Sequence, residues 1–395
     1  MIVWIRGFAD AGGLMGNVTA VMKWCGLLIA VALIIGWLAA GWFSPPASAH
    51  GTFSPVDIGD CKVRTLLVDG QPTTILELME DRLTYTSADG KTEWVAVKGT
   101  LTDGASIPSF ALSFTGDKFS APFLKAAIVH DAYCQCFIKD QCPEQYHKRS
   151  WREVHQMFRD ACIAGGTDVR RANLLFAAVW ICGPRWGDDS RSLCGVAADY
   201  QRILFHDCKA FIETSPEKPA EKNREKNERS AAEIEVWMEK RQPTILAIND
   251  LETQAMKFME TGDLPAAVET LTAAEKTLDE ASTKLPNDLM VQNLRGYHHK
   301  NLAILYQSAD RPQKKQAELE KAENAFQSVI SIRPSDPSAL NGMGSVSILR
   351  GELDTAKDFV DQALKIDPTY PAARQDRALI DKIERERARD AAPPQ

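Results

Sequence analysis

Four residues carry the chemistry that this sequence could perform: Asp103, Ser106, His130 and Asp131. His130 and Asp131 are adjacent in the run Ala126-Ala-Ile-Val-His-Asp131, and the other two precede them in Thr102-Asp-Gly-Ala-Ser-Ile-Pro108. If this loop folds over the run, Ser106 could be a nucleophile with His130 as its base. Alternatively, His130 could activate a water molecule while Asp131 or Asp103 holds a divalent cation.

A purely structural interpretation explains the same residues. Asp103-Gly104 is a typical turn, because Asp accepts backbone hydrogen bonds and Gly adopts positive φ. His130 and Asp131 could hydrogen-bond this loop and hold it on a helix, which would satisfy buried polar groups without catalysis. No cofactor is predicted and no metal-ligand set is assigned. A divalent cation near Asp131 remains an alternative.

The helix that would position His130 begins after Ser120, with Pro122 in its first turn. Apolar spacing places Phe123, Ala127, His130 and Cys134 on one face, so we expect His130 to be half-buried. Asp131 is displaced by about 100° around the helix, and we therefore expect it not to orient the neighbouring ring directly.

Strands should precede this helix and two helices should follow it. Short apolar or β-branched runs separated by turn signals predict an antiparallel meander, with strands at 73–79, 83–86 and 94–97. Helices are predicted at 144–164 and 168–182. On the first of these, His147, Trp151 and His155 would share a face at the edge of the core. A metal site formed by the two histidines is the alternative. Strands followed by about three helices predict an α+β domain.

The positions of the cysteines indicate how far the same domain extends. After Cys25, eight cysteines lie between 61 and 208 and none follows. An even number in an exported domain indicates disulfides, although the pairing of eight thiols cannot be deduced from spacing. The predicted disulfide cysteines are Cys61, Cys134, Cys136, Cys142, Cys162, Cys182, Cys194 and Cys208. The alternative is a metal cluster, for which Cys134, Cys136, Cys142 and nearby histidines could supply ligands, although their spacing matches no common zinc motif.

The N-terminal segment predicts export. Lys23 precedes an apolar run at 24–43, and Pro45-Pro46 and Ala47-Ser-Ala49 follow, which is typical of a signal peptide cleaved after Ala49. An uncleaved anchor is the alternative, since the run is long enough to span a bilayer. We expect a periplasmic or secreted protein, or one anchored in the inner membrane and facing the periplasm. The net charge of -7 argues against nucleic-acid binding.

The second half contains helical repeats. Ile332-Arg-Pro334 and Ile366-Asp-Pro368 lie 34 residues apart, and small residues recur at Gly344, Ala356 and Ala363. These features resemble the tetratricopeptide repeat, which implies an all-α superhelix that binds a protein or peptide partner. An insertion near 308–315 interrupts the middle repeat. The expected domains are 1–49 leader, 50–214 cysteine-rich α+β domain, 215–243 charged linker, 244–385 repeats and 386–395 disordered tail.

Two families are similar to the first domain. The Thr-Asp-Gly-Ala-Ser-Ile-Pro loop and the alanine-rich helix with His130-Asp131 resemble the bacterial and phage domain of unknown function 1353. In that family an acid often stands where His155 stands here. The order His130, Asp131, Tyr133, Cys134 is also similar to the active helix of secreted phospholipases A2, whose His activates water and whose Asp helps to bind calcium.

Two hypotheses follow. In the first, the chain is an exported adaptor whose repeat array recruits an unknown protein or peptide to a disulfide-stapled domain. In the second, it is an exported hydrolase, phospholipase- or amidase-like, that uses His130 as general base. The membrane would be contacted only through an uncleaved N-terminal segment.

Overall fold

The computed structural model describes residues 50–54, 62–68, 71–104, 107–108, 111, 117, 119–138, 141–187, 191–214 and 228–390. The expected leader lies outside these residues, as does 391–395 of the expected tail. From His50 onward the chain forms one compact unit. None of the helices in the described part combines the length and hydropathy that a membrane span needs.

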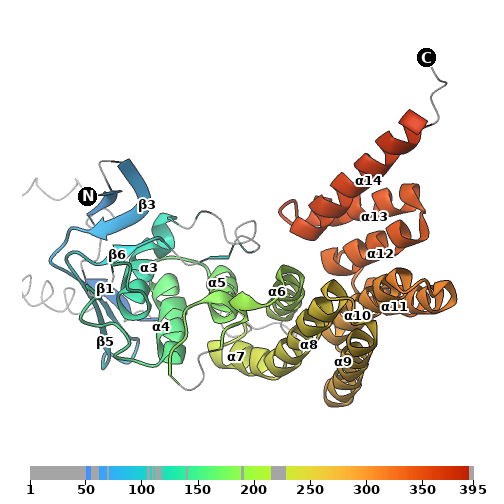
Figure 1. The fold of residues 1–395 in the computed structure, drawn as a ribbon. Coiled ribbons are helices and arrows are strands. Elements are labelled where there is room, and N and C mark those ends of the chain that lie inside the picture. Colours follow the sequence, from blue (N-terminus) through green and yellow to red (C-terminus); the bar gives the residue numbers. More distant parts are fainter. Residues whose placement is uncertain are drawn as a thin grey trace, which may run out of the picture. The chain divides into compact units, whose positions relative to one another are not determined.

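Two three-stranded antiparallel sheets form the N-terminal part (Figure 1). One has the order β1-β4-β5 and the other β2-β3-β6. The strands are β1 (Thr52–Ser54), β2 (Val63–Val68), β3 (Gln71–Leu78), β4 (Arg82–Thr86), β5 (Glu93–Val97) and β6 (Leu101–Thr102). β3, β4 and β5 lie where strands were predicted, whereas β1, β2 and β6 were not predicted, and the arrangement is not a single meander. β3 pairs with β6 rather than with β4, and its last residue Leu78 donates its N–H to Thr100.

The helices that follow are α3 (Ala121–Cys134), α4 (Trp151–Ala164), α5 (Val169–Cys182), the short 3₁₀ helix η2 (Leu193–Gly195) and α6 (Ala198–Glu213). α4 starts at Trp151 and not at Glu144 as predicted. Its true start is a capping box, in which Ser150 and Glu153 exchange side-chain and backbone hydrogen bonds. Immediately before it, His147 has a φ of 56°, which no α-helix accommodates.

Much of the interval expected as a linker is folded. The helix α7 (Ala231–Glu239) begins at a second capping box, formed by Ser230 and Glu233. Its Ile234 and Met238 are completely buried, and the helix packs against α5 and α6. The charge density that suggested a linker belongs to the solvent side of this helix, together with residues outside the described range.

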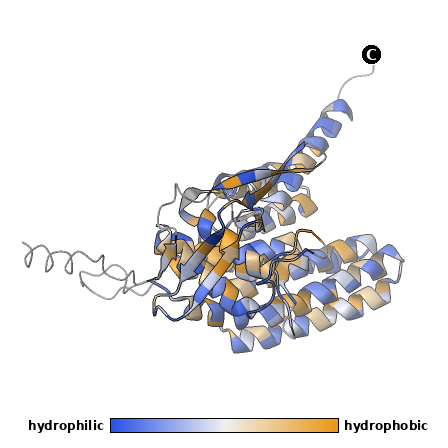
Figure 2. Ribbon diagram, turned by 90° about the vertical axis from the view of Figure 1, so that its left-hand side faces the viewer, coloured by the Kyte–Doolittle hydropathy of each residue, from blue (hydrophilic) through white to orange (hydrophobic). Residues whose placement is uncertain are grey.

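The C-terminal half is a tetratricopeptide-type array of antiparallel helices. It comprises α8 (Gln242–Glu260), α9 (Leu264–Lys284), α10 (Leu289–Ser308), α11 (Pro312–Ile332), α12 (Pro337–Arg350), α13 (Leu353–Ile366) and α14 (Pro371–Asp390). Figure 2 shows hydrophobic and hydrophilic residues alternating along these helices, as expected where each helix buries one face.

The spacing of 34 residues holds only for the last pair, between the first residues of α12 and α14, Pro337 and Pro371. The preceding pairs are longer because their helices are longer. No inserted loop separates α10 from α11, since Ser308 ends one and Pro312 begins the other. The additional residues that the sequence indicates near 308–315 therefore do not form a loop, and they extend both helices.

Glycine lets neighbouring helices of the array approach one another. A Cβ atom on Gly296 of α10 would lie 2.4 Å from the ring of Phe326, and one on Gly342 of α12 would lie 2.3 Å from the same ring. The fully buried Phe326 of α11 thus sits between two glycines. Gly344 plays the same part against Val360 of α13, at 2.6 Å. This is the close packing that the small residues in the sequence predicted.

Helix α6, which the sequence did not reveal, joins the two halves. It packs against α5 on one side and against α10 and α12 of the array on the other. Three side chains reach across this boundary: Tyr200 bonds to Glu252 of α8, Arg202 to Asp367, and Asp207 to Arg333. The first helices of successive repeats, α8, α10 and α12, therefore already contact α6 of the same chain.

Candidate functional site

His130 and Asp131 lie in the penultimate turn of α3 and are sealed from solvent. His130 is 1% exposed and Asp131 is completely buried. The prediction of a half-buried His130 is therefore wrong, because α3 is covered on nearly all sides by the sheets and by α4. His130 also meets its neighbour directly, with 3.3 Å between Nδ1 and an Asp131 carboxylate oxygen. The two side chains turn toward each other, although their positions are about 100° apart around the helix.

Asp131 fixes the loop before α3 to the helix. The Thr102 hydroxyl donates to one carboxylate oxygen at 2.6 Å and accepts from the backbone N–H of Gly104. The Gln135 amide donates to the other oxygen at 3.2 Å and also lies 3.5 Å from the Asp103 carboxylate. Asp103 is thus brought to Asp131 through Gln135 and not to His130. This supports the structural interpretation of Asp131.

His155 on α4 is the partner that sequence reasoning missed. Its Nδ1 lies 2.9 Å from Nε2 of His130, and the ring is completely buried beside Trp151. It is part of the core and not of its edge. One signal could have found it, since an acid often occupies this position in the family that the loop resembles.

Cys134 completes the cluster one helical turn after His130. Its Sγ lies 3.3 Å from Nδ1 of His130 and 3.9 Å from Asp131, and it is a free thiol. One ligand atom from each of His130, Asp131 and Cys134 can be chosen so that all three lie within 4.8 Å of one another. These three residues could hold a metal ion.

Burial dominates the electrostatics of the cluster. It raises the pKa of Asp131, against the hydrogen bonds from His130 and Thr102 that lower it. It also raises the pKa of the Cys134 thiol well above its usual range. Burial and the neighbouring His130 hold the pKa of His155 well below its usual value, so His155 is neutral.

Ser106 lies outside the described residues, and its role as nucleophile stays a prediction. His147 is not on α4 and stacks on Trp186, with ring centroids 4.2 Å apart. A paired-histidine site involving His147 is therefore absent from the described structure.

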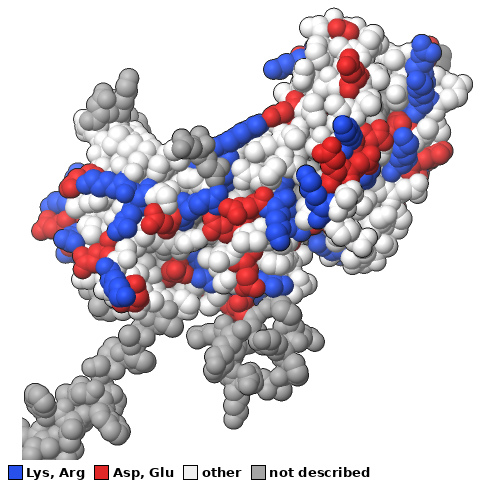
Figure 3. Space-filling view, turned by 90° about the horizontal axis from the view of Figure 1, so that it is seen from below, with Lys and Arg blue, Asp and Glu red and all other residues white. Residues whose placement is uncertain are grey.

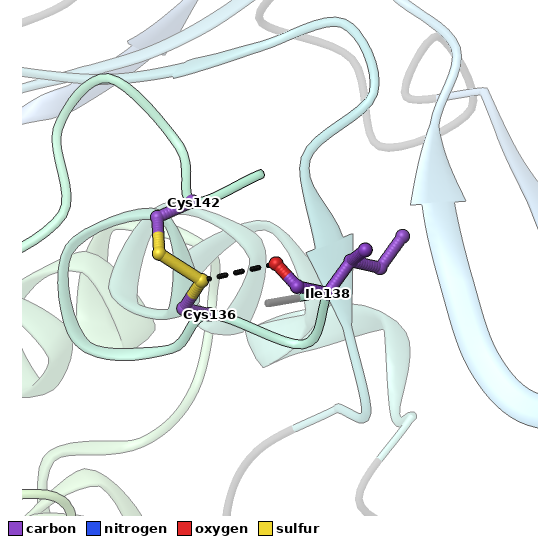
Figure 4. Close-up of a disulfide and its surroundings, with 3 residues drawn as sticks. All are labelled: Cys136, Ile138 and Cys142. Carbon is purple, nitrogen blue, oxygen red and sulfur yellow. Dashed lines mark hydrogen bonds between the residues drawn. A yellow bond between two sulfur atoms is a disulfide. The ribbon is translucent and has the colours of Figure 1, made fainter. Parts of the chain in front are cut away.

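The disulfide prediction holds for one pair. Cys136 and Cys142 form a disulfide in the loop after α3 (Figure 4). Cys134, Cys162, Cys182, Cys194 and Cys208 are free, which corrects the prediction for these five. Cys134, Cys162 and Cys208 are buried in the core, on α3, α4 and α6. Cys61 lies outside the described residues.

A second candidate site lies where α6 meets the array. A cavity of about 310 Å³ opens between α6, α8 and α10. Met256, Met259 and Ile304 give it an apolar floor, and Thr253 and Asn301 add polar groups. Met256 is 52% exposed. The cavity offers room for a side chain that this chain does not itself supply.

Comparison with known proteins supports the first resemblance. Residues 77–179 match the family described as Protein of unknown function (DUF1353). The match spans β3 to α5 and includes His130, Asp131, Cys134 and His155.

Two proteins of Sinorhizobium fredii (strain NBRC 101917 / NGR234) are similar to this chain. Uncharacterized protein y4iH is 36% identical over 138 residues, which cover 35% of this chain and 48% of that protein. Uncharacterized protein y4jT is 28% identical over 159 residues, which cover 40% of this chain and 41% of that protein. The chain thus spans less than half of the length of either relative.

Solved structures similar to this chain are tetratricopeptide domains. The Sgt2 domain from Aspergillus fumigatus covers 38% of this chain and 85% of its own length, with 15% identity and a TM-score of 0.24. The C-terminal domain of an FK506-binding protein from Plasmodium falciparum covers 37% and 93%, with 19% identity and a TM-score of 0.23. The repeat assignment rests on the helix pairs and glycine contacts described above.

Proposed function

We propose that the chain is an adaptor, in which the array captures a peptide segment of a partner protein beside α6 and so holds that partner next to the DUF1353 domain. The observation that carries this proposal is the cavity between α6, α8 and α10. It lies on the first helices of the repeats and is lined by an exposed methionine. Methionine side chains adapt to differently shaped apolar groups, as a peptide-binding surface requires.

The cavity limits what the partner can present. A volume of about 310 Å³ is at the low end for ligand pockets, so it accepts one large apolar side chain rather than a helix. Polar side chains such as Thr253 and Asn301 can hydrogen-bond the backbone on either side of that anchor. Helix α6 already packs against α10 and α12, so we expect the partner's segment to be short.

The adaptor proposal is tested with a peptide library displayed on phage and panned on the purified chain. Thr253→Trp fills the cavity and should abolish binding of the enriched peptides. Thr272→Trp makes the same change at an exposed position of α9 and should leave binding intact. Enriched peptides that bind both variants equally would place the binding surface elsewhere. An unchanged circular dichroism spectrum shows that each variant is folded.

Export is part of the same proposal. The signal-like segment before His50 and the Cys136–Cys142 disulfide both support a destination outside the reducing cytosol. Cell fractionation with thiol alkylation tests it. We expect the chain in the envelope or periplasmic fraction, with Cys136 and Cys142 protected from alkylation until a reductant is added. A cytosolic chain with both thiols open to alkylation would rule out export.

Hydrolysis centred on His130 is less well supported. A general base must come within hydrogen-bond reach of the proton that it removes. His130 is 1% exposed and both of its ring nitrogens already contact protein groups. In this conformation no substrate reaches it.

Charges of both signs cover the face of the molecule that Figure 3 shows. Lys and Arg side chains alternate with Asp and Glu across the face shown in Figure 3. A continuous stripe of Lys and Arg side chains, which phosphate binding needs, does not appear on this face. The net charge of -7 agrees with this.

A further inference from the structure

We propose that His130, Asp131 and Cys134 bind one zinc-class divalent ion at the end of α3. This inference is independent of the adaptor function. It begins from the convergence of an imidazole nitrogen, a carboxylate oxygen and a thiol sulfur, all supplied by one helical turn. Zinc takes this mixture of ligand types, whereas magnesium and calcium take oxygen alone.

The distances suit a tetrahedral ion. With bonds of about 2.0–2.2 Å to nitrogen and oxygen and about 2.3 Å to sulfur, such an ion holds its ligand atoms about 3.3–3.6 Å apart. Nδ1 of His130 lies 3.3 Å from the Asp131 oxygen and 3.3 Å from the Cys134 sulfur. The third edge, from Cys134 to Asp131, is 3.9 Å. Small side-chain rotations would close it, without movement of the helix.

The second ring nitrogen of His130 has the partner that a metal-bound histidine needs. Metal-ligating histidines donate their other N–H to a fixed acceptor, which sets the tautomer. Here Nε2 of His130 lies 2.9 Å from Nδ1 of His155. If Nε2 donates, Nδ1 of His155 accepts, and the other ring nitrogen of His155 faces Gly183. That nitrogen is buried and has no hydrogen-bond partner among the described residues.

Nδ1 of His130 contacts both Asp131 and Cys134, so either a proton or a metal ion can lie between these groups. A proton alone would leave Cys134 as a weakly bonded thiol in the same contact. A divalent ion uses all three groups, since it balances one carboxylate and one thiolate. Among the described residues, His130 is the sole ion-pair partner recorded for Asp131, so no lysine or arginine competes for this role.

The other contacts of the site keep the ligands in place. Thr102 and Gln135 both donate to Asp131 and fix the orientation of its carboxylate. The Phe158 ring packs on the His130 ring, with centroids 4.9 Å apart. Ligands held in this way need little ordering when an ion enters, which favours tight binding.

Metal content of the purified full chain tests the proposal. The chain is equilibrated with micromolar zinc, freed of unbound metal by gel filtration, and analysed by elemental mass spectrometry. We expect about one zinc ion per chain for the wild type and for Cys162→Ser, a buried thiol on α4 that serves as control. Cys134→Ser should lose nearly all of the metal. His155→Phe should weaken zinc binding by about 10–100-fold through the loss of its support for His130.

Cobalt provides a second, spectroscopic readout. Bound at this site in the wild type, Co²⁺ should show a thiolate-to-cobalt charge-transfer band. The band should persist in Cys194→Ser, which removes the exposed thiol, and disappear in Cys134→Ser. A wild type without metal and without the band would overturn the proposal, as would a Cys134→Ser variant that retains both. In those cases the cluster is held by protons alone.

Discussion

At the residue scale, the Thr102–Asp131 hydrogen bond is the contact that joins the loop motif to the helix motif. Both partners are completely buried, and the bond length is 2.6 Å. A buried carboxylate that loses a hydroxyl donor suffers the desolvation penalty without compensation. The contact explains why the loop and the His-Asp pair occur together without requiring that either be catalytic.

The first prediction tests this contact. Thr102→Val removes the hydroxyl and keeps the shape, and it should lower the free energy of unfolding by about 1–3 kcal/mol. Thr102→Ser keeps the hydroxyl and should recover most of the loss. Urea unfolding followed by tryptophan fluorescence measures both variants. Equal stability of the two would show that the hydroxyl contributes nothing.

The second prediction concerns the disulfide. Reducing it, or replacing Cys136 and Cys142 together by serine, should lower the free energy of unfolding by about 2 kcal/mol, because it closes a short loop. Thermal unfolding with and without a reductant measures this. The double serine variant should no longer respond to the reductant. If it responds as the wild type does, another pair of cysteines forms a disulfide.

Sequence patterns identified several functional-site residues but not their surroundings. His130, Asp131 and Asp103 were found from their chemistry, and Asp131 and Asp103 do meet through Gln135. The contact between His130 and His155 joins residues on different helices, and a periodic pattern on one helix does not report on another. Free Cys134 was misassigned because counting thiols does not distinguish a buried thiol from a paired one.

At the scale of elements, glycine contacts set how closely the array helices pack. Phe326 needs the absence of a side chain at Gly296 and at Gly342. The tetratricopeptide pattern predicted such positions, because small residues and a large apolar residue recur in it. The lengths of α8 to α11 could not be predicted in the same way, since additional helical turns leave the pattern of small residues nearly unchanged.

The third prediction follows from this packing. Gly342→Ala would place a methyl group 2.3 Å from the Phe326 ring, so the ring or the helix must move. We expect a loss of about 1–3 kcal/mol in the free energy of unfolding. Gly195→Ala is the control, because its Cβ would meet nothing within 4 Å. Chemical denaturation of the two variants should separate them clearly, and similar values would mean that the array adapts at no cost.

At the scale of the whole molecule, Arg202 joins α6 to the far end of the array. Its guanidinium donates to Asp367 at 2.6 Å and to the Thr369 carbonyl at 3.1 Å. Burial raises the pKa of Asp367. The hydrogen bonds from His206 and Thr369 and the charge of Arg202 outweigh this effect and lower the pKa to about 2. Burial lowers the pKa of Arg202, yet the guanidinium remains charged because its ordinary value is so high.

The fourth prediction concerns this ion pair. Arg202→Met leaves Asp367 buried without its cation and should lower the free energy of unfolding by about 3–5 kcal/mol. Arg64→Met removes one partner of the more exposed Arg64–Glu77 pair and should change it by less than about 1 kcal/mol. Thermal unfolding compares the two variants. A small effect at Arg202 would mean that α6 is held by its apolar contacts alone.

The fifth prediction concerns pH. The pKa of Asp367 in the folded chain, about 2, lies below the ordinary value of 3.8. The contribution of the ionised Asp367 to the free energy of unfolding is therefore fully present at neutral pH. It is lost as pH falls through 3.8 toward about 2. The stability difference between wild type and Asp367→Asn should shrink between pH 6 and pH 3. A difference that stays constant over this range would contradict the assigned pKa.

The two-part organisation was predictable because composition changes sharply after the last cysteine. The role of α6 was not predictable, because it is buried on several sides and so lacks the alternation of polar and apolar residues that marks a surface helix. Its Arg202 and Asp207 are buried ionic residues, which a hydropathy pattern assigns to solvent. Only the fold shows where their partners lie.

The location of α6 also determines where the protein can be divided. Composition suggests a cut after residue 214, which would separate a cysteine-containing fragment from a repeat fragment. Such a cut would remove the α6 partners of Asp367, Glu252 and Arg333 and would uncover the surface of α10 and α12 that packs against α6. A soluble repeat fragment for biochemical work should therefore begin before α6, at η2, even though that segment belongs by its cysteines to the other half.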